Sequence, residues 1–173
     1  MFWDRAAWVY DIFADIINRK ANKEMCAAVV RELSSSDTVL ECACGTGLLS
    51  GAIAKKCSSL VATDFSFGML KRAEKKYKNC GIRFERADIL HLDFPDENFD
   101  AIVAANVIHL LDEPYRALRE LDRVCRRGGK IVVPTYMNCT KKGKTNGITA
   151  VIGKAGVDFK REFTPQTYEK FFT

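Results

Sequence analysis

Hydrophobic residues in the first part of the chain recur at helical spacing. They return every three or four positions, at Trp3, Ala6, Tyr10, Phe13 and Ile17. This spacing predicts an amphipathic helix over roughly the first 20 residues. A second helix is predicted through Met25, Val29 and Leu33, and the polar run 34–37 ends it.

Beyond this point, short apolar runs alternate with amphipathic segments. The apolar runs predict strands at 38–42, 60–64, 82–86, 99–105 and 130–133. Helices are predicted between them at 48–53, at 66–77 with Ser66 as the N-cap, and at 114–124, where Gly128-Gly129 closes the helix. A last helix should begin at Thr164-Pro165.

Five strands alternating with helices predict an α/β fold of the Rossmann-like, doubly wound type, with a mainly parallel sheet. Such a sheet binds its ligand at the carboxyl ends of the strands. We expect one domain over 1–173. It would have an N-terminal helical segment over 1–36, a cofactor-binding core over 37–136 and an incomplete C-terminal part over 137–173.

Composition narrows the class of protein. No apolar run approaches the roughly 20 residues that span a bilayer, and no secretory signal is apparent. The seven cysteines are odd in number, and no Cys or His pair near Cys42 and Cys44 would complete a metal site. We therefore expect reduced thiols, no metal and a cytoplasmic protein. The net charge of +5, with lysines late in the chain, does not favour nucleic acid as a partner.

The first predicted strand runs into a turn made of small residues, Glu41-Cys42-Ala43-Cys44-Gly45-Thr46-Gly47. A backbone of this kind can pass close to a ligand. It would suit either a dinucleotide pyrophosphate or the methionine part of S-adenosylmethionine. The dinucleotide pattern Gly-x-Gly-x-x-Gly fails, because counting from Gly45 places Ser50 at the third glycine.

Two carboxylates follow the next two strands. Asp64 ends the second strand, where a carboxylate commonly accepts hydrogen bonds from ribose hydroxyls. It could instead be a helix-entry residue before Ser66. Asp88, just past the third strand, could accept from an adenine amino group or could be a turn residue.

These motifs together resemble the class I S-adenosylmethionine-dependent methyltransferases, particularly the branch with the quinone-biosynthesis C-methyltransferases and many small-molecule enzymes. The resemblance runs from about Trp3 to Val133. It is carried by four stretches in order: 39–47, 62–70, Ala87-Asp88 with Phe94-Pro95 and Phe99-Asp100, and 106–109 leading to Arg123-Val124 and Gly128-Gly129-Lys130.

The resemblance implies S-adenosyl-L-methionine as the cofactor and assigns its contacts. Gly45 and Gly47 would line the methionine part, and Glu41 would anchor the loop and face the amino group. Ala43 stands where the family usually has its first glycine. Asp64 would hold the ribose, and Phe65 or Met69 would lie against the adenine ring. Asp88 and Ile89 would meet the adenine edge, and Asn106 would approach the methionine end. Tyr10, in the N-terminal helix, would cover the cofactor.

The expected reaction is in-line methyl transfer to a small-molecule acceptor. It requires mainly alignment and exclusion of water, and a base only if the acceptor holds a proton. His109, after the fourth strand, is the candidate base, although the family's histidine there is mostly structural. The alternatives are an RNA or protein methyltransferase, an NAD-dependent oxidoreductase and a non-catalytic S-adenosylmethionine-binding module.

The end of the chain departs from the family pattern. Relatives add two antiparallel strands after the fifth strand, and this chain has no room for both before Thr173. An uncovered edge strand invites pairing with another chain. We therefore expect either a truncated sequence or a homo-oligomer joined through the fifth strand. The region 137–156 should then be the most mobile part.

Overall fold

The computed structural model describes residues 19–135, 137 and 160–172. The elements in chain order are α2 (Arg19–Glu32), β1 (Thr38–Cys42), α3 (Ser50–Ala54), β2 (Ser59–Asp64), α4 (Phe67–Lys76), β3 (Ile82–Arg86), β4 (Phe99–Ala104), the 3-10 helix η1 (Ile108–Leu110), α5 (Pro114–Val124), β5 (Cys125–Val132) and α7 (Pro165–Phe171). The predicted N-terminal helix and Tyr10 lie outside the described residues.

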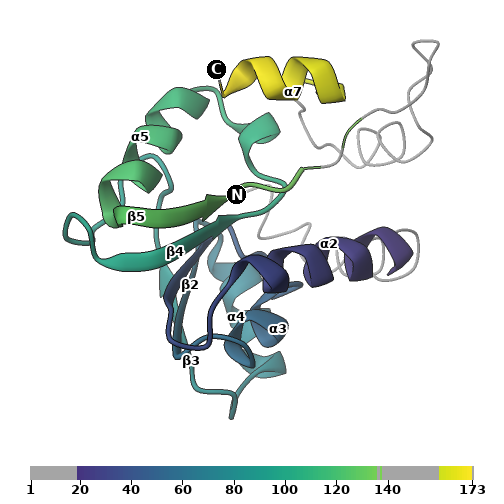
Figure 1. Cartoon of the computed structure of the whole chain (residues 1–173). Coiled ribbons are helices and arrows are strands. Elements are labelled where there is room, and N and C mark those ends of the chain that lie inside the picture. The colour runs from purple at the N-terminus through teal and green to yellow at the C-terminus, as the bar shows by residue number, and fades with distance from the viewer. Residues whose placement is uncertain (1–18, 136, 138–159, 173) are drawn as a thin grey trace.

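The five strands form one sheet in the order β3-β2-β1-β4-β5, and every pair is parallel (Figure 1). The chain moves outward from β1 to β3 and then crosses back to place β4 on the other side of β1. The strand order therefore reverses between β1 and β4, and a parallel α/β sheet binds its ligand at such a reversal. The Rossmann-like fold class is confirmed.

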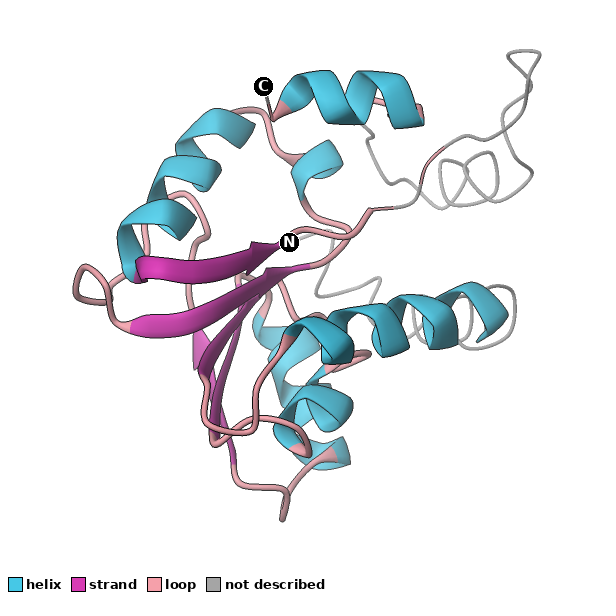
Figure 2. Ribbon diagram, viewed as in Figure 1, coloured by secondary structure: helices cyan, strands magenta, loops and turns pink. Residues whose placement is uncertain are grey.

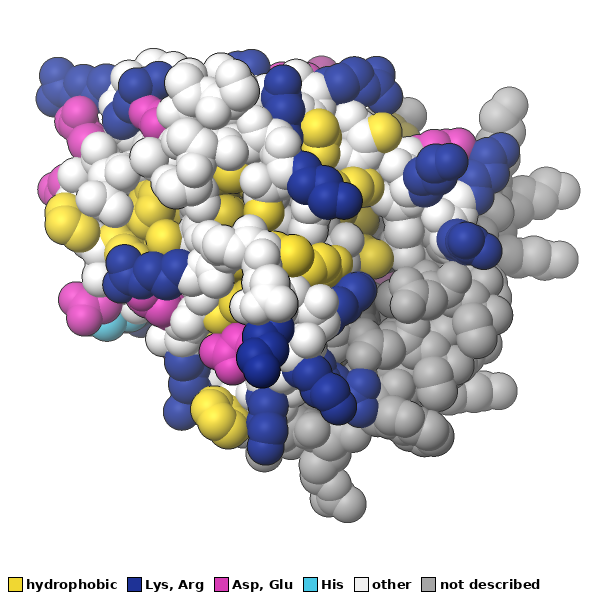
Figure 3. Space-filling view, turned by 90° about the horizontal axis from the view of Figure 1, so that it is seen from below, with side chains coloured by type: hydrophobic (Ala, Val, Ile, Leu, Met, Phe, Trp, Pro, Cys, Tyr) yellow, Lys and Arg dark blue, Asp and Glu magenta, His cyan; other side chains and the backbone are white. Residues whose placement is uncertain are grey.

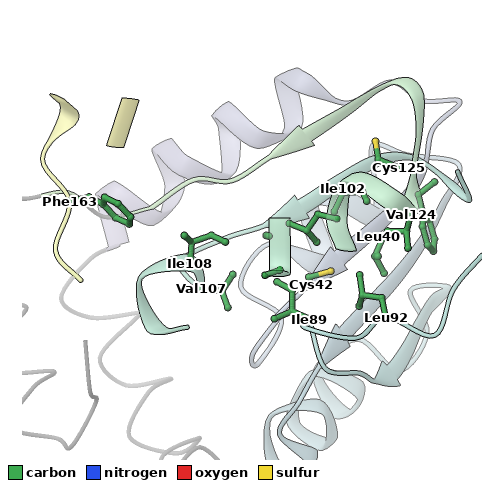
Figure 4. Close-up of a cluster of buried hydrophobic side chains, with 14 residues drawn as sticks. Leu40, Cys42, Ile89, Leu92, Ile102, Val107, Ile108, Val124, Cys125 and Phe163 are labelled. Atoms are coloured by element: carbon green, nitrogen blue, oxygen red, sulfur yellow. The ribbon is translucent and has the colours of Figure 1, made fainter. Parts of the chain in front are cut away.

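Helices cover both faces of the sheet (Figure 2). Both faces of a buried strand need such cover, because its successive side chains point to opposite sides. Val39, Ala101 and Val103 pack with residues of α2, α3 and α4. Leu40 and Ile102 belong to a second cluster, which includes Val124 of α5 and appears in Figure 4. The sheet is therefore the middle layer of three.

Two helices, α4 and α7, begin where the sequence predicts. Ser66 accepts a hydrogen bond from the backbone N–H of Met69, and Thr164 accepts one from Thr167. Such caps satisfy amide groups that have no partner inside the helix. Both predicted helix starts are confirmed.

The prediction that Gly128-Gly129 closes a helix was wrong. Helix α5 already ends at Val124, and β5 begins at Cys125. The register against β4 shifts after the Phe99–Cys125 pair. Gly128 takes φ +72° in this irregular stretch, and a Cβ on Gly129 would lie 2.7 Å from the Asp100 carbonyl oxygen. The two glycines therefore serve a bulge and a close backbone contact.

The described C-terminal segment packs against η1 and the end of β5. The Arg161 guanidinium donates to the carbonyl oxygens of Ile108 at 3.1 Å and Leu111 at 2.6 Å. Phe163 is buried in the α5-side cluster, and the Tyr168 hydroxyl donates to the Val133 carbonyl. Within the described residues β5 pairs only with β4. The mobility predicted for 137–156 falls, apart from Met137, outside them.

Candidate active site

The loop after β1 is fastened to the end of β2. The Cys44 amide donates to the Thr63 carbonyl at 2.9 Å, and the Gly45 amide donates to Asp64 Oδ2 at 2.8 Å. The other carboxylate oxygen, Oδ1, accepts from the Ser66 amide at 2.8 Å. Asp64 therefore ties the loop to the start of α4, which is the helix-entry role considered for it. Its ribose contact stays a prediction, and a carboxylate oxygen can accept more than one hydrogen bond.

Left-handed backbone conformations flank the point where the strand order reverses. Ala43 after β1 and Asn106 after β4 both have φ 53°, and Gly45 and Gly47 have φ 58° and 83°. A left-handed residue with a side chain is costly, and such strain concentrates at functional sites. Ala43 thus keeps the backbone shape of a glycine at the cost of strain.

Tyr77, which the sequence placed only among the packing positions of a predicted helix, supports the loop after β1. Its hydroxyl donates to the Gly47 carbonyl at 2.8 Å. Its ring occupies the space that side chains on Gly47 and Gly51 would need, with closest approaches of 2.7 and 2.3 Å from an added Cβ. The only signal in the sequence is a glycine inside a helix, where glycine is unfavourable.

Glu41 is a buried carboxyl group beneath the loop. It is 2% exposed and accepts a 2.6 Å hydrogen bond from the Ser50 hydroxyl of α3. Burial raises the pKa of Glu41 to about 8, the Ser50 hydrogen bond opposes this, and the charge of Asp64 adds to it. Glu41 is therefore largely protonated at neutral pH, and a cation nearby would favour its ionisation.

The ends of β2 and β3 present an aromatic ring and a second carboxylate. Phe65 is 44% exposed, and the Arg86 guanidinium lies 5.3 Å from its ring centre. Asp88 Oδ1 accepts from the Leu90 amide at 2.9 Å, which is a turn contact. Ile89 and Met69 are buried. Of the two residues predicted to face the adenine ring, Phe65 is therefore the exposed one.

Asn106 connects the end of β4 to two other elements. Its amide donates to the Pro134 carbonyl at 2.8 Å, and its side-chain amide lies 3.6 Å from the Met25 sulfur of α2. Helix α2 therefore reaches the same edge of the sheet. Beside it, a hollow of about 450 Å³ is lined by Arg19, Asn22, Lys23, Cys26, Ala27, Val30, Leu48 and Ala52.

His109 is a buried member of η1. Its Nδ1 lies 3.0 Å from the Thr135 hydroxyl, and its carbonyl accepts from the Lys160 and Arg161 amides. Burial, followed by the positive charge of Arg161, lowers the pKa of His109 to about 4. An imidazole with this pKa is a weak proton acceptor at neutral pH. These contacts favour the structural role for His109.

Within the part of the chain that the structure describes, no group of three or more His, Cys, Asp or Glu side chains could hold a metal ion. Burial raises the pKa of Cys42 to about 12, so its thiol stays protonated. No described helix is long and apolar enough to cross a membrane.

Comparison with known proteins places the chain in a family. Residues 40–133 match the methyltransferase domain family, and this match covers more than half of the chain. The chain therefore belongs to the methyltransferase domain family. The family and the fold imply S-adenosylmethionine as the cofactor.

Individual relatives agree with this assignment. The chain is 34% identical over 126 residues to a phosphatidylethanolamine N-methyltransferase of Cereibacter sphaeroides, covering 70% of this chain and 59% of that protein. It is 33% identical over 140 residues to a demethylmenaquinone methyltransferase of Renibacterium salmoninarum, covering 80% and 58%. A solved S-adenosylmethionine-dependent methyltransferase of Thermotoga maritima has the same fold, with a TM-score of 0.77, 22% identity and coverage of 98% and 76%. The chain thus spans less than two thirds of these two curated relatives.

The residues predicted to bind the cofactor suit it chemically. Gly45 and Asp64 meet through their hydrogen bond at one edge of the sheet, Ala43 directly follows β1 at that edge, and Asn106 lies there after β4. The edge offers a small-residue loop, carboxylates for hydroxyl and amino donors, and an exposed ring for an adenine. Tyr10 is the one predicted contact outside the described residues.

Proposed function

We propose that this chain transfers the methyl group of S-adenosylmethionine to a small-molecule acceptor by in-line displacement. The observation that carries the proposal is the strained loop 43–47, pinned to Asp64 at the strand-order reversal of a methyltransferase-family sheet. A preformed loop loses little conformational entropy when it binds a ligand. More of the binding energy is then available to align the two reactants.

Each part of the cofactor has a proposed partner. Gly45 and Gly47 would line the methionine part, and the positive charge of a bound cofactor would favour the ionised form of Glu41 beneath the loop. Asp64 accepts from the ribose hydroxyls, and Asp88 with Ile89 meets the adenine edge. Phe65 lies against the adenine ring, and Asn106 faces the methionine end. The bound cofactor supplies an already activated methyl carbon.

The residues around the site align the reactants and exclude water, and no base is assigned among them. The low pKa of His109 and its contacts to Thr135 and the C-terminal segment support a structural role. An acceptor that is already deprotonated or carries a free lone pair needs no base. This suits an amine or an ionised hydroxyl.

The names of two relatives support a lipid-like small molecule as the acceptor. The Cereibacter protein is named for phosphatidylethanolamine and the Renibacterium protein for demethylmenaquinone. Both compounds carry long hydrocarbon tails. We therefore propose an acceptor with a reactive polar head and an apolar tail.

Calorimetry with S-adenosylmethionine tests the cofactor step. Asp64→Ala should weaken binding by about 1.5–3 kcal/mol, the range for losing a charged hydrogen-bond partner. Asp93→Ala, an exposed loop carboxylate, is the matched control and should bind normally. Unchanged affinity in Asp64→Ala would refute the ribose assignment, and tight binding of NAD with none of S-adenosylmethionine would favour the oxidoreductase alternative.

Methyl-labelled cofactor tests the acceptor. The label should pass to phosphatidylethanolamine or to a demethylated quinone presented in detergent micelles. Transfer to a mixed RNA or protein substrate instead would refute the small-molecule proposal. Cofactor binding with no transfer to any of these acceptors would favour a binding module.

A further inference from the structure

Positive charge is concentrated on one layer of the molecule. Helices α2, α3 and α4 with the turns that follow them, residues 19–37, 50–58 and 66–78, carry eleven Lys and Arg against four Asp and Glu. The whole chain has a net charge of only +5. Figure 3 views the side on which α3 and α4 lie and shows Lys and Arg side chains spread across it.

The opposite layer shows no such excess. Residues 112–124, around α5, carry three arginines and four acidic side chains. Arg123 there is paired with Glu120 at 2.9 Å and with Asp96 at 2.7 Å. The excess of positive charge is therefore confined to one face of the molecule. Keeping the surface solvated does not by itself require such an asymmetry.

Helix α4 adds an exposed aromatic ring to this charge. Phe67 is 66% exposed, more than the other large hydrophobic side chains exposed in the described structure. Lys71 and Lys75 follow it at four-residue steps, and all three are exposed on one stripe of the helix, with Lys78 just beyond its end. We call Phe67, Lys71, Lys75 and Lys78 the α4 stripe.

The α4 stripe begins beside the candidate active site. Helix α4 starts directly after the carboxyl end of β2, where Asp64 holds both the loop and the Ser66 amide. Phe65, exposed at the same turn, lies against Arg86. A surface that contacts the α4 stripe would therefore border the crevice.

We propose that the α4 stripe docks this chain onto an anionic lipid bilayer, with Phe67 entering the interface and the lysines facing the headgroups. Lysine-rich stripes with an aromatic residue bind such surfaces through charge attraction and apolar burial. Nucleic acid is less favoured, because Phe67 stands at the end of the stripe and is not interleaved with the lysines. This docking would bring the crevice of the proposed enzyme to a tailed acceptor within the bilayer.

Vesicle co-sedimentation tests this proposal without requiring activity. The chain should bind vesicles of equal parts phosphatidylglycerol and phosphatidylcholine, and far less to pure phosphatidylcholine. Binding should fall when the salt rises from about 0.1 M to about 0.5 M, because salt screens exposed charges. The combined variant Lys71→Gln, Lys75→Gln, Lys78→Gln should lower partitioning roughly 100-fold, at about fivefold for each lysine.

Two further variants separate the stripe from general charge. Phe67→Ser should lower partitioning at least about tenfold, since a buried ring contributes that much. The matched control Arg116→Gln, Arg119→Gln, Arg127→Gln removes three exposed charges elsewhere and should bind as wild type. Equal loss in the control, full binding by Phe67→Ser, or binding of an RNA oligomer with none to vesicles would overturn the proposal. Vesicle binding by a protein that transfers no label to phosphatidylethanolamine or a demethylated quinone would leave docking supported and count against the proposed function.

Discussion

The contact between Gly51 and Tyr77 allows a prediction about stability. Whether Gly51→Ala stabilises or destabilises the protein should depend on the presence of the Tyr77 ring. An alanine Cβ at position 51 would lie 2.3 Å from Tyr77 Cε1 and 2.9 Å from Cζ, well inside van der Waals contact. The ring would have to move, and the hydroxyl would then lose its 2.8 Å bond to the Gly47 carbonyl. We therefore predict that Gly51→Ala destabilises the protein, although alanine is the better helix former.

The magnitude follows from three opposing contributions. Overpacking costs about 1–3 kcal/mol, and the lost hydrogen bond about 1 kcal/mol. Alanine in place of glycine in α3 returns at most about 1 kcal/mol. The free energy of unfolding should fall by about 1–3 kcal/mol, which lowers Tm by about 2–4 °C per kcal/mol for a chain of this size.

The Tyr77→Ala background provides the decisive comparison. Without the ring, Gly51→Ala meets no clash and should raise the free energy of unfolding by up to about 1 kcal/mol. Urea unfolding of the wild type, both single variants and the double variant measures this cycle. If Gly51→Ala has the same effect in both backgrounds, the ring does not determine the residue at position 51.

Three further variants test the site. Ala43→Gly should stabilise the protein by up to about 1 kcal/mol in urea unfolding. It removes left-handed backbone strain of about 1–2 kcal/mol and adds an entropic cost of about 0.5–1 kcal/mol. A less stable variant would contradict the strain at Ala43. The pKa of Glu41 is raised to about 8 from 4.5, so between these pH values the native state holds a proton that the unfolded state has released. The free energy of unfolding should therefore fall as the pH rises from 4.5 to about 8. Glu41→Gln should flatten that fall in a series of melting curves, and an unchanged slope would contradict the protonated carboxyl. His109, with its pKa lowered to about 4 from 6.5, should cost stability as pH falls between those values. His109→Asn should remove this acid sensitivity and keep at least about a tenth of the turnover, because loss of a general base typically costs about 10²–10⁴-fold.

Hydrophobic periodicity was sufficient to predict the first four strands, whereas β5 begins at Cys125, five residues before its predicted start. The third strand has the predicted bounds, and β4 ends one residue earlier than expected. The prediction failed at Gly128-Gly129, because a glycine pair signals a break in regular structure without telling whether a helix end or a bulge causes it. The close approach of Gly129 to the Asp100 carbonyl is a contact between distant segments that periodicity does not record.

The site was predictable in outline and not in its supporting contacts. The position of Asp64 after a strand was informative, but its use by the Gly45 and Ser66 amides depends on the turn geometry. Tyr77 acts through one hydrogen bond across 30 positions of chain, and the Arg161 guanidinium acts through two, across 53 and 50 positions. Such long-range contacts leave no local pattern in one sequence.

The attachment of the C-terminal segment to η1 has a consequence for the integrity of the molecule. Arg161 binds two carbonyls of the body, Phe163 enters its core, and Tyr168 bonds to Val133. A peptide bond cut between 138 and 159 would therefore leave two polypeptides held together by these contacts and by others of the same segment, such as the Lys160–Asp112 ion pair. We expect a nicked preparation to elute as one species in gel filtration and to separate into two polypeptides in denaturant. The C-terminal segment 160–172 would then behave as a non-covalently bound subunit.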